Sequence, residues 1–452
     1  MYRKNAWEKY KDNLSTVMDF AEEYKRYISL GKTERLVTKE SVELLRKAGF
    51  KSLEEVKSLK AGDRVYLVNK NKNVCAFIIG NKPLLEGLRI LGAHIDSPRL
   101  DLKESPFYEK NGFALADTHY YGGVKKYQYV TIPLALHGVV CKKDGSVVEV
   151  HIGEKEDDPI IGITDLLIHL SADQMAKPLA KAIEGENLDL SLGSIPLEDK
   201  GAKDYVLNLL KEQYGVEEED FISAEIEVVP AGPARDYGLD RSMVAGYGHD
   251  DRVCAFTSLK ALLDTKEVEH TACCILVDKE EIGSVGATGA QSLFFENAIA
   301  ELAAKLGEKD LLYVARLAMQ ASKMLSSDVS AGFDPLYPGV NDPKNAAYFG
   351  QGLVFNKYTG SRGKSGSNDA NPEYYAFIRR TMDEADVNWQ SSELGRVDQG
   401  GGGTIAYILG NYNMSVIDAG IPVLNMHAPM EIVSKVDVYE AYRGYKAFLI
   451  AK

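Results

Sequence analysis

The sequence predicts an α/β protein: a mostly parallel central sheet flanked by helices, with a β-rich domain inserted into the chain. First, strand-like apolar runs alternate with amphipathic runs after Gly232, the pattern of a parallel sheet covered by helices. Second, similar apolar runs precede residue 100. Third, residues 101–235 change character and carry strands such as YQYVTIPLALHGVV and SVVEVHI. We therefore expect residues 1–100 and 236–452 to form one domain and 101–235 to be the insertion.

In the first part, residues 7–28 place apolar side chains at three- and four-residue spacing, which predicts one amphipathic helix. The runs RVYLVN, NVCAFIIG and GLRILGAHID are short, β-branched and bounded by Gly, Asn and Pro, which is typical of strands. In the insertion, TDLLIHLSADQM predicts a short helix, and an acidic, loop-rich stretch precedes the strand EIEVVP.

In the last part, the predicted order is helix 250–263, strand HTACCILVD, helices QSLFFENAIAELAAKL and LLYVARLAMQASKML, and strand GLVFNKY. A final helix is expected to begin near Ser434. Asp437 lies three residues later, which predicts a variant of the capping box.

The composition narrows the range of partners. The chain of 452 residues has 53 Lys and Arg against 66 Asp and Glu, a net charge of −13, without a basic run. Nucleic acid and anionic membranes require positive charge, so peptides or small molecules are the expected partners. The charged N-terminus and the absence of a long apolar run predict a cytoplasmic protein. Five cysteines without CxxC spacing predict reduced, buried thiols.

Polar side chains follow several predicted strands. The candidates are His94 with Asp96, Asp250, the pair Glu280 and Glu281, Asp328, and His427. Because the carboxyl ends of strands line the ligand crevice of an open α/β sheet, these positions can converge. Two imidazoles and three carboxylates suit two divalent ions that share one carboxylate.

Each candidate also has an ordinary structural explanation. A histidine after a strand is usually a hydrogen-bonded turn residue, and Asp250 with Asp251 before a helical run can cap that helix. Asp328 can be a turn residue, and His427 before Ala-Pro can be structural. The adjacent glutamates differ, because one can bind metal while the other acts as a base.

Taken together, the motifs H-x-D-S-P, D-D opening a helix, D-x-E-E-I-G-S, S-S-D and M-H resemble, in order and spacing, the aspartyl aminopeptidases of the dinuclear zinc exopeptidase clan. The resemblance covers nearly the whole chain and implies a zinc exopeptidase-like fold. It implies that His94, Asp250 and Asp328 hold one metal and that Asp250, Glu281 and His427 hold the other. Glu280 is then the general base and Asp96 orients His94.

The implied reaction is release of N-terminal residues, acidic ones above all, by metal-activated water. The implied cofactors are two divalent ions per subunit, zinc first, although cobalt and manganese accept the same ligands. An acidic preference needs a cation near the first side chain, and the loop YTGSRGKSGSN offers Arg362 and Lys364. A solvated basic loop is the alternative, and the loop departs from the eukaryotic pattern in its extra Gly and Ser.

The insertion contains His169 in TDLLIHLSAD, where a packed core histidine is the default expectation. The resemblance implies instead that the insertion is a dimerisation domain, in which His169 contacts the oxyanion in the neighbouring subunit's site. It also implies a homo-oligomer, a dodecamer built from dimers. Gly400 to Gly403 either let backbone approach a bound peptide or form a plain turn.

Three other functions compete with this one. A carboxypeptidase or amidohydrolase of the same clan would keep the metals and change the substrate. A non-catalytic scaffold has no need for so many clustered carboxylates. Serine or cysteine nucleophile chemistry is disfavoured because no GxSxG motif occurs and Cys254 lies inside a helical run.

Overall fold

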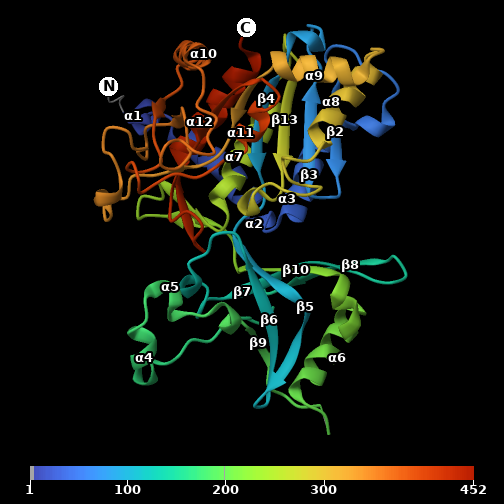
Figure 1. Ribbon diagram of the computed structural model, residues 1–452, viewed down its shortest axis with the longest axis vertical. Helices are drawn as coiled ribbons and strands as arrows, with labels where there is room; N and C mark the ends of the chain where they lie inside the picture. Colours follow the sequence, from blue (N-terminus) through green and yellow to red (C-terminus); the bar gives the residue numbers. More distant parts are fainter. Residues whose placement is uncertain (1–4, 198) are drawn as a thin grey trace. The chain divides into compact units, whose positions relative to one another are not determined.

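The computed structural model describes residues 5–197 and 199–452 and divides into two compact units (Figure 1). The first unit contains the chain up to Asp96 together with Ala234–Met426 and Glu431–Lys452. The second contains Ser97–Pro233, the inserted segment, together with His427–Met430. Its role in dimerisation stays a prediction.

The first unit is built on a nine-stranded sheet of mixed direction (Figure 1). The four central strands β13, β4, β14 and β18 run parallel to one another, and antiparallel pairs flank them. The strands in spatial order are β1 (Lys51–Ser52), β2 (Arg64–Asn69), β3 (Asn73–Ile78), β13 (Ala272–Val277), β4 (Arg89–His94), β14 (Lys323–Ser326), β18 (Ser415–Gly420), β16 (Leu353–Asn356) and β17 (Trp389–Ser391).

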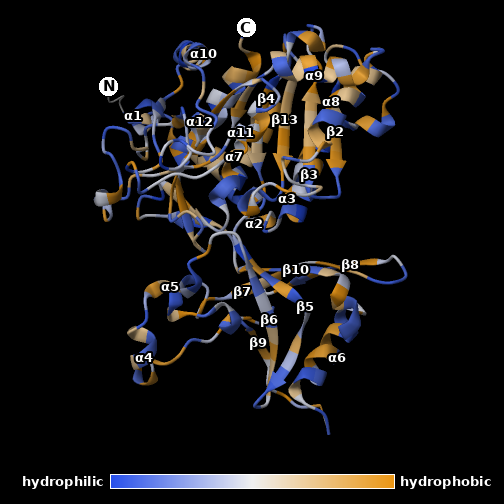
Figure 2. Cartoon of the chain, viewed as in Figure 1, coloured by the Kyte–Doolittle hydropathy of each residue, from blue (hydrophilic) through white to orange (hydrophobic). Residues whose placement is uncertain are grey.

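Apolar side chains on both faces explain why these segments form central strands. Every residue of β3, β4 and β13 is buried, and the strands are among the most hydrophobic parts of the chain in Figure 2. Strands buried on both faces carry continuous rather than alternating apolar runs. Val277 of β13 lies opposite His94 of β4, so the carboxyl ends of these strands meet.

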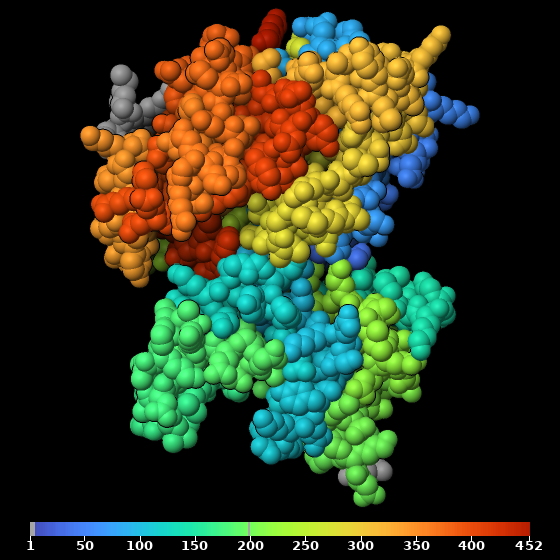
Figure 3. Space-filling view, viewed as in Figure 1, coloured from blue at the N-terminus to red at the C-terminus, as the bar shows by residue number. Residues whose placement is uncertain are grey.

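Helices cover both faces of the sheet. Leu91 and Cys274 pack into one core, whereas their neighbours Ile90 and Cys273 pack into another, as the alternation of a strand requires. The first core receives α2 (Leu14–Leu30), α3 (Glu34–Lys47), α7 (His249–Leu263), α10 (Pro372–Glu384) and α12 (Lys435–Ile450). The second receives α8 (Phe294–Lys305), α9 (Leu311–Ala321) and α11 (Ala406–Gly410), and the gold atoms of α8 and α9 form the upper right of the surface in Figure 3.

A smaller five-stranded sheet completes the first unit. Its order is β11 (Arg235–Tyr237), β12 (Met243–Gly246), β20 (Glu431–Ser434), β19 (Pro422–Leu424) and β15 (Ser330–Ala331). Strand β12 leads directly into α7, and β15 follows Asp328. The small sheet therefore fixes the entry to the helix that carries Asp250 and the segment after Asp328.

Two predicted helices end differently in the structure. The helix expected over 7–28 is two helices, α1 (Ala6–Tyr10) and α2, because Asn13 has φ −149° and ψ 58° and cannot continue a helix. The helix expected through Leu325 ends at Ala321, and Lys323–Ser326 instead form the mostly buried strand β14. Pairing on both sides with β4 and β18 outweighs the helical spacing of these residues.

The inserted unit is an antiparallel six-stranded sheet with its own core. Its order is β8 (Val147–Ile152), β7 (Leu134–Cys141), β10 (Ala224–Pro230), β5 (Arg99–Lys110), β6 (Phe113–Tyr121) and β9 (Leu190–Gly193). The expectation of loops before β10 is wrong in part, since α6 spans Ala202–Tyr214 and ends at Gly215 with φ 69°. Residues 164–175 form only a 3-10 turn, Ile168–Leu170, and the short α4, Ala172–Met175.

Two smaller expectations also need correction. Ser434 precedes α12 as predicted, but its side chain makes no capping hydrogen bond, and Asp437 accepts instead from the backbone N–H groups of Gly350 and Gly352, at 2.7 Å each. The cysteines are free thiols, but Cys141 is exposed while the other four are buried. Among the residues that the structure describes, no helix is long and apolar enough to span a membrane.

Candidate metal centre

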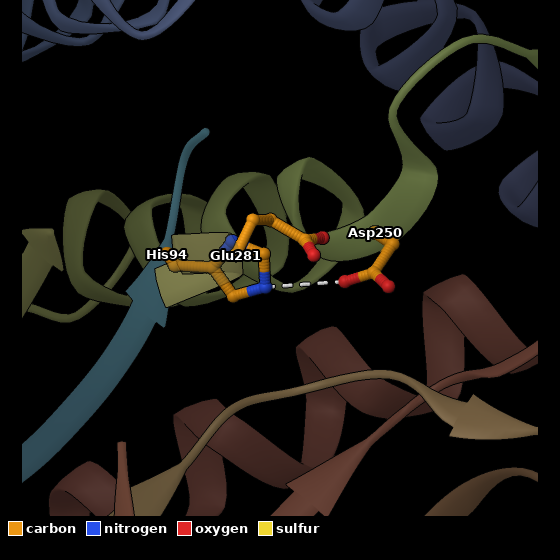
Figure 4. Close-up of side chains that lie close together, drawn as sticks. All are labelled: His94, Asp250 and Glu281. Carbon is orange, nitrogen blue, oxygen red and sulfur yellow. Dashed lines mark hydrogen bonds and ion pairs between the residues drawn. The ribbon is translucent and has the colours of Figure 1, made fainter. Parts of the chain in front are cut away.

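The end of β4 brings the first candidate ligands together (Figure 4). His94 is buried, and its Nε2 lies 3.1 Å from Oδ1 of Asp250, a residue of the first turn of α7. Ligand atoms of His94, Asp250 and Glu281 all lie within 4.8 Å of one another. Three residues that are far apart in sequence, from three elements, therefore form one cluster.

The hydrogen bonds of His94 leave its Nε2 suited to a metal. Its Nδ1 lies 3.0 Å from the backbone carbonyl of Asp96, and because a carbonyl only accepts, Nδ1 carries the hydrogen. In the neutral ring Nε2 then presents a lone pair beside a carboxylate oxygen. A cation between these atoms removes that repulsion, and ligand atoms of a tetrahedral zinc site are about 3.4 Å apart. The residues fit a zinc ion.

Asp96 connects the two halves of the cluster. Its Oδ1 accepts the backbone N–H of Glu280 at 3.1 Å, and its Oδ2 accepts that of Glu281 at 3.2 Å. Its Oδ1 also lies 3.3 Å from Nδ1 of His94. One fully buried carboxylate thus orients the histidine and holds the turn that carries both glutamates.

That turn, Glu280–Ile282, is a single 3-10 turn separated from the end of β13 by Asp278 and Lys279. Lys279 before it and Gly283 after it have left-handed backbone, with φ of 69° and 96°. Both glutamates are partly exposed, in contrast to His94 and Asp250. The turn therefore carries two carboxylates at the open side of a buried cluster.

A second group contains His94, Asp251 and Asp328, again within 4.8 Å of one another. Asp251 is fully buried, whereas the sequence pattern predicts only a helix-capping residue at this position. Its adjacency to Asp250 was the available signal, but only the fold shows that both carboxylates face the cluster. Glu431 was also missed: its Oε2 accepts the backbone N–H of Asp250 at 3.0 Å.

The electrostatics of the cluster favour a bound cation. Burial alone lowers the pKa of His94, but without an ion the hydrogen bonds with Asp250 and Asp96 outweigh it and raise that pKa well above its usual range, so a proton and a metal ion compete for Nε2 in the same negative environment. Burial raises the pKa of Asp251, and the charge of Asp328 adds to it. Burial likewise raises the pKa of Asp328. Crowded, desolvated carboxylates of this kind are stabilised by metal charge.

His427 belongs by its contacts to the second unit and is in none of the ligand groups of the described residues. Its Nδ1 donates to the backbone carbonyl of Gly123 at 3.0 Å, so the neutral ring keeps a lone pair on Nε2. This is the tautomer that a metal ligand needs. Its assignment to the second metal stays a prediction.

The remaining candidates lie on the surface of the chain. His169 is exposed in the turn Ile168–Leu170, so the expectation of a packed core histidine is wrong. Arg362 and Lys364 are both exposed, and Lys364 lies 3.3 Å from Asp369 and 3.9 Å from the ring centroid of Tyr358.

Part of the glycine run after Asp398 is explained by a close approach of two segments. A Cβ on Gly401 would lie 2.3 Å from Cα of Ser361, and its φ is 126°. Glycine is therefore required there to bring the run against the basic loop that contains Arg362.

Comparison with known proteins agrees with this geometry. The family model described as "Aminopeptidase I zinc metalloprotease (M18)" matches residues 27–449. The chain is 55% identical to a probable M18 family aminopeptidase 1 of Clostridium acetobutylicum, over 99% of this chain and 98% of that protein. It is 44% identical to the probable M18 family aminopeptidase 1 of Thermotoga maritima, over 99% of both.

Solved structures have the same fold. The crystal structure of the M18 aminopeptidase from Thermotoga maritima has a TM-score of 0.97 at 43% identity and covers 100% of both chains. That of aminopeptidase I from Clostridium acetobutylicum has a TM-score of 0.93 at 54% identity, covering 99% and 98%. The S. cerevisiae mApe1 dodecamer, at 21% identity, has a TM-score of 0.77 and covers 95% and 96%. The chain therefore belongs to the M18 family and is a zinc metallo-aminopeptidase.

Proposed function

We propose that the protein is a dinuclear aminopeptidase that removes acidic residues from the N-termini of peptides. The observation that carries this proposal is the cluster of His94, Asp250 and Glu281, held by the carboxylate of Asp96. A largely buried set of imidazole and carboxylate groups beside an extra glutamate is what metal-assisted hydrolysis needs.

The proposed ligands are divided between two metal ions, and one residue serves both. His94, Asp250 and Asp328 would hold one ion, and Asp250, Glu281 and His427 would hold the other, with Asp250 contributing to both. Asp251 adds negative charge beside His94 and Asp328. When bound, zinc lowers the pKa of water and polarises the carbonyl of the scissile bond.

The protein's own residues then handle the proton. Glu280 accepts it from the attacking water and passes it to the leaving amine, as a general base and then a general acid. Asp96 fixes the backbone of Glu280 through the hydrogen bond to its N–H, which positions the carboxylate without touching substrate. His94 is held in one tautomer by the Asp96 carbonyl and acts only as a ligand.

The acidic preference is assigned to the basic loop. Arg362 is exposed, and Lys364 contacts Asp369 at the edge of the same loop, which leaves Arg362 as the better candidate for a substrate carboxylate. Arg362→Ala should raise KM for an Asp-linked amide about 10-fold or more and leave a Leu-linked amide unchanged, since a charged hydrogen bond contributes about 1.5–3 kcal/mol. Arg241 is a matched control, because it is also exposed with positive φ.

The proposed working form is an oligomer in the cytoplasm, a dodecamer built from dimers through the inserted unit. The segment around His169 supports an interface, because Leu167, Ile168 and Leu170 are 53%, 69% and 68% exposed. We propose that His169 completes the partner's site as an oxyanion donor. The S. cerevisiae mApe1 structure is described as a dodecamer, and we propose the same number of subunits for this protein.

One experiment tests the reaction. Zinc per subunit is measured alongside hydrolysis of Asp-, Glu-, Leu- and Lys-linked amides, each with a free and a blocked N-terminus. Two zinc ions, fastest cleavage of the acidic substrates, and none of the blocked ones are expected. Cleavage of blocked substrates would show a carboxypeptidase or amidohydrolase instead.

A second experiment tests assembly. Light scattering should give a mass many times 49.8 kDa. Inactive Glu280→Gln and His169→Phe proteins, dissociated and reassembled together, should recover activity in mixed dimers. An active monomer, or mixed dimers without activity, would refute the role of His169.

A further inference from the structure

The inserted unit contains a pair of histidines outside the proposed catalytic cluster. His137 on β7 and His151 on β8 are directly opposite each other in the antiparallel hairpin. Their Nδ1 atoms are 3.1 Å apart, and the rings are tilted by 57°. The side chain of His137 is 6% exposed, whereas that of His151 is 39% exposed. The pair is therefore anchored on one side and open to solvent on the other.

The outer nitrogens of both rings face carboxylates. Nε2 of His137 lies 3.0 Å from Oε1 of Glu154, and Nε2 of His151 lies 3.4 Å from Oε2 of Glu149. Ionised carboxylates only accept hydrogen bonds, so each Nε2 carries a hydrogen. In two neutral rings, both Nδ1 atoms then have lone pairs that face each other. This arrangement needs a positive charge between them.

We propose that the Nδ1 atoms of His137 and His151 bind a divalent transition-metal ion, zinc first, at a site separate from the catalytic centre. Two nitrogens at zinc bond lengths and a tetrahedral angle lie about 3.4 Å apart, a few tenths of an ångström from the separation here. A ligand histidine whose other nitrogen donates to a carboxylate is the usual arrangement around protein zinc. Water would complete the coordination on the solvent-exposed side, that of His151.

The surrounding charges are suited to such an ion. Glu149 and Glu154 supply two negative charges beside the rings. Glu227 lies opposite His137 on the other neighbouring strand, β10, and is paired with Arg99 at 3.0 Å, so its charge is offset. Imidazole ligands select zinc, copper, nickel or cobalt over calcium and magnesium.

The site also has a structural consequence. Oε2 of Glu154 accepts the backbone N–H of Gly232 at 2.9 Å, near the end of the inserted unit. An ion that fixes His137 therefore strengthens a chain of contacts from the hairpin to the segment where the inserted unit ends. The site is expected to stabilise the inserted unit rather than to take part in hydrolysis.

The test counts zinc in the full-length protein. Wild type and His151→Gln are dialysed against buffered free zinc over the micromolar range, and bound zinc is measured per subunit. Wild type should bind one more ion than His151→Gln. His119→Gln is the matched control, because His119 is also an exposed strand histidine of the inserted unit and should keep that ion. Because the side chain of His151 is partly exposed, the variant should fold as wild type does, and far-UV circular dichroism checks this.

A second measurement identifies the ligands. With the catalytic ions in place, one equivalent of Cu²⁺ should give an electron paramagnetic resonance signal with coupling to two nitrogens, lost in His151→Gln and kept in His119→Gln. Equal zinc counts in wild type and His151→Gln would overturn the proposal and leave a shared proton between the rings. If the catalytic proposal were wrong, the number of catalytic ions would differ from two in wild type, His151→Gln and His119→Gln alike. The difference of one ion between His151→Gln and the other two proteins would be unaffected.

Discussion

Replacing Asp96 by Asn should weaken metal binding although Asp96 is not itself proposed as a ligand. The carboxylate accepts the N–H groups of both Glu280 and Glu281, at 3.1 and 3.2 Å. An asparagine side chain has one oxygen, so its NH₂ group would face the second N–H, donor against donor. The turn that carries Glu281 must then move or lose a hydrogen bond.

The size of the effect follows from these contacts. A hydrogen bond to a charged group contributes about 1.5–3 kcal/mol, and Asp96→Asn removes one and makes the other neutral. Loss of groups that orient ligands typically costs 10–100-fold in metal affinity, or about 1.4–2.8 kcal/mol. We therefore expect the zinc dissociation constant to rise by about that factor. The kcat at saturating zinc should also fall, because Glu280 shares the turn.

Zinc affinity is measured by competition with a chromogenic chelator, and kcat with the fastest aminoacyl amide. Asp437→Asn provides a matched control. Asp437 is also a fully buried carboxylate that accepts two backbone N–H groups, at 2.7 Å each, from Gly350 and Gly352. Its replacement should reduce folding stability without changing zinc affinity. If Asp96→Asn binds zinc as tightly as wild type, the proposed link between Asp96 and the ligands is wrong.

Other expected outcomes test the remaining parts of the site. Glu280→Gln should keep its metals and lose at least about 100-fold in kcat; a smaller loss would show that Glu280 is not the base. Asp250→Ala should bind both metals weakly, and two tightly held ions would place the bridge elsewhere. Gly420→Ala should cost about 1–3 kcal/mol of stability and weaken metal binding, because the added Cβ would lie 1.6 Å from the Asp328 carbonyl oxygen. Gly339→Ala, with nothing within 4 Å, is its control, and equal urea midpoints would contradict the clash. Burial raises the pKa of Asp437 from 3.8 to about 7, so between these values the native state holds a proton that the unfolded chain has lost. The stability that the native state gains from holding this proton on Asp437 is fully present at low pH and is lost as the pH rises to about 7. The urea midpoint of wild type relative to Asp437→Asn should therefore fall from pH 4 to 7, and a pH-independent difference would contradict the shift.

The strands and the convergence of the first candidate ligands could be predicted because their information is local. The segments β2, β3, β4 and β13 are mainly apolar, and polar residues lie at or just after the ends of β4 and β13. Chain direction in a parallel sheet then places those polar residues at one edge, without knowledge of any contact. His94 and Glu281 meet for this reason.

Contacts between distant segments carried information that no local pattern contains. Asp251 follows Asp250 in sequence, and as a helix-capping acid it needs no partner, yet its buried carboxylate reaches His94 and Asp328. His169 lies in an apolar stretch, which predicts a core position. In the structure that stretch is exposed, and the turn Ile168–Leu170 contains no buried residue. An apolar pattern predicts that a segment is covered. It does not say whether the same chain covers it.

Asp437 shows the same difference within a single helix. Its position three residues after Ser434 matches a capping box, in which the acid would reach back to the backbone N–H of Ser434. The turn at Gly350 and Gly352 instead presents two N–H groups to the buried face of α12, and an unpaired buried N–H costs about 1–3 kcal/mol. A capping hydrogen bond would stabilise the N-terminus of α12 by less free energy than two buried N–H donors cost when they have no acceptor. The carboxylate therefore serves the tertiary contact, and a local motif gives way wherever a buried group elsewhere in the chain needs the same side chain more.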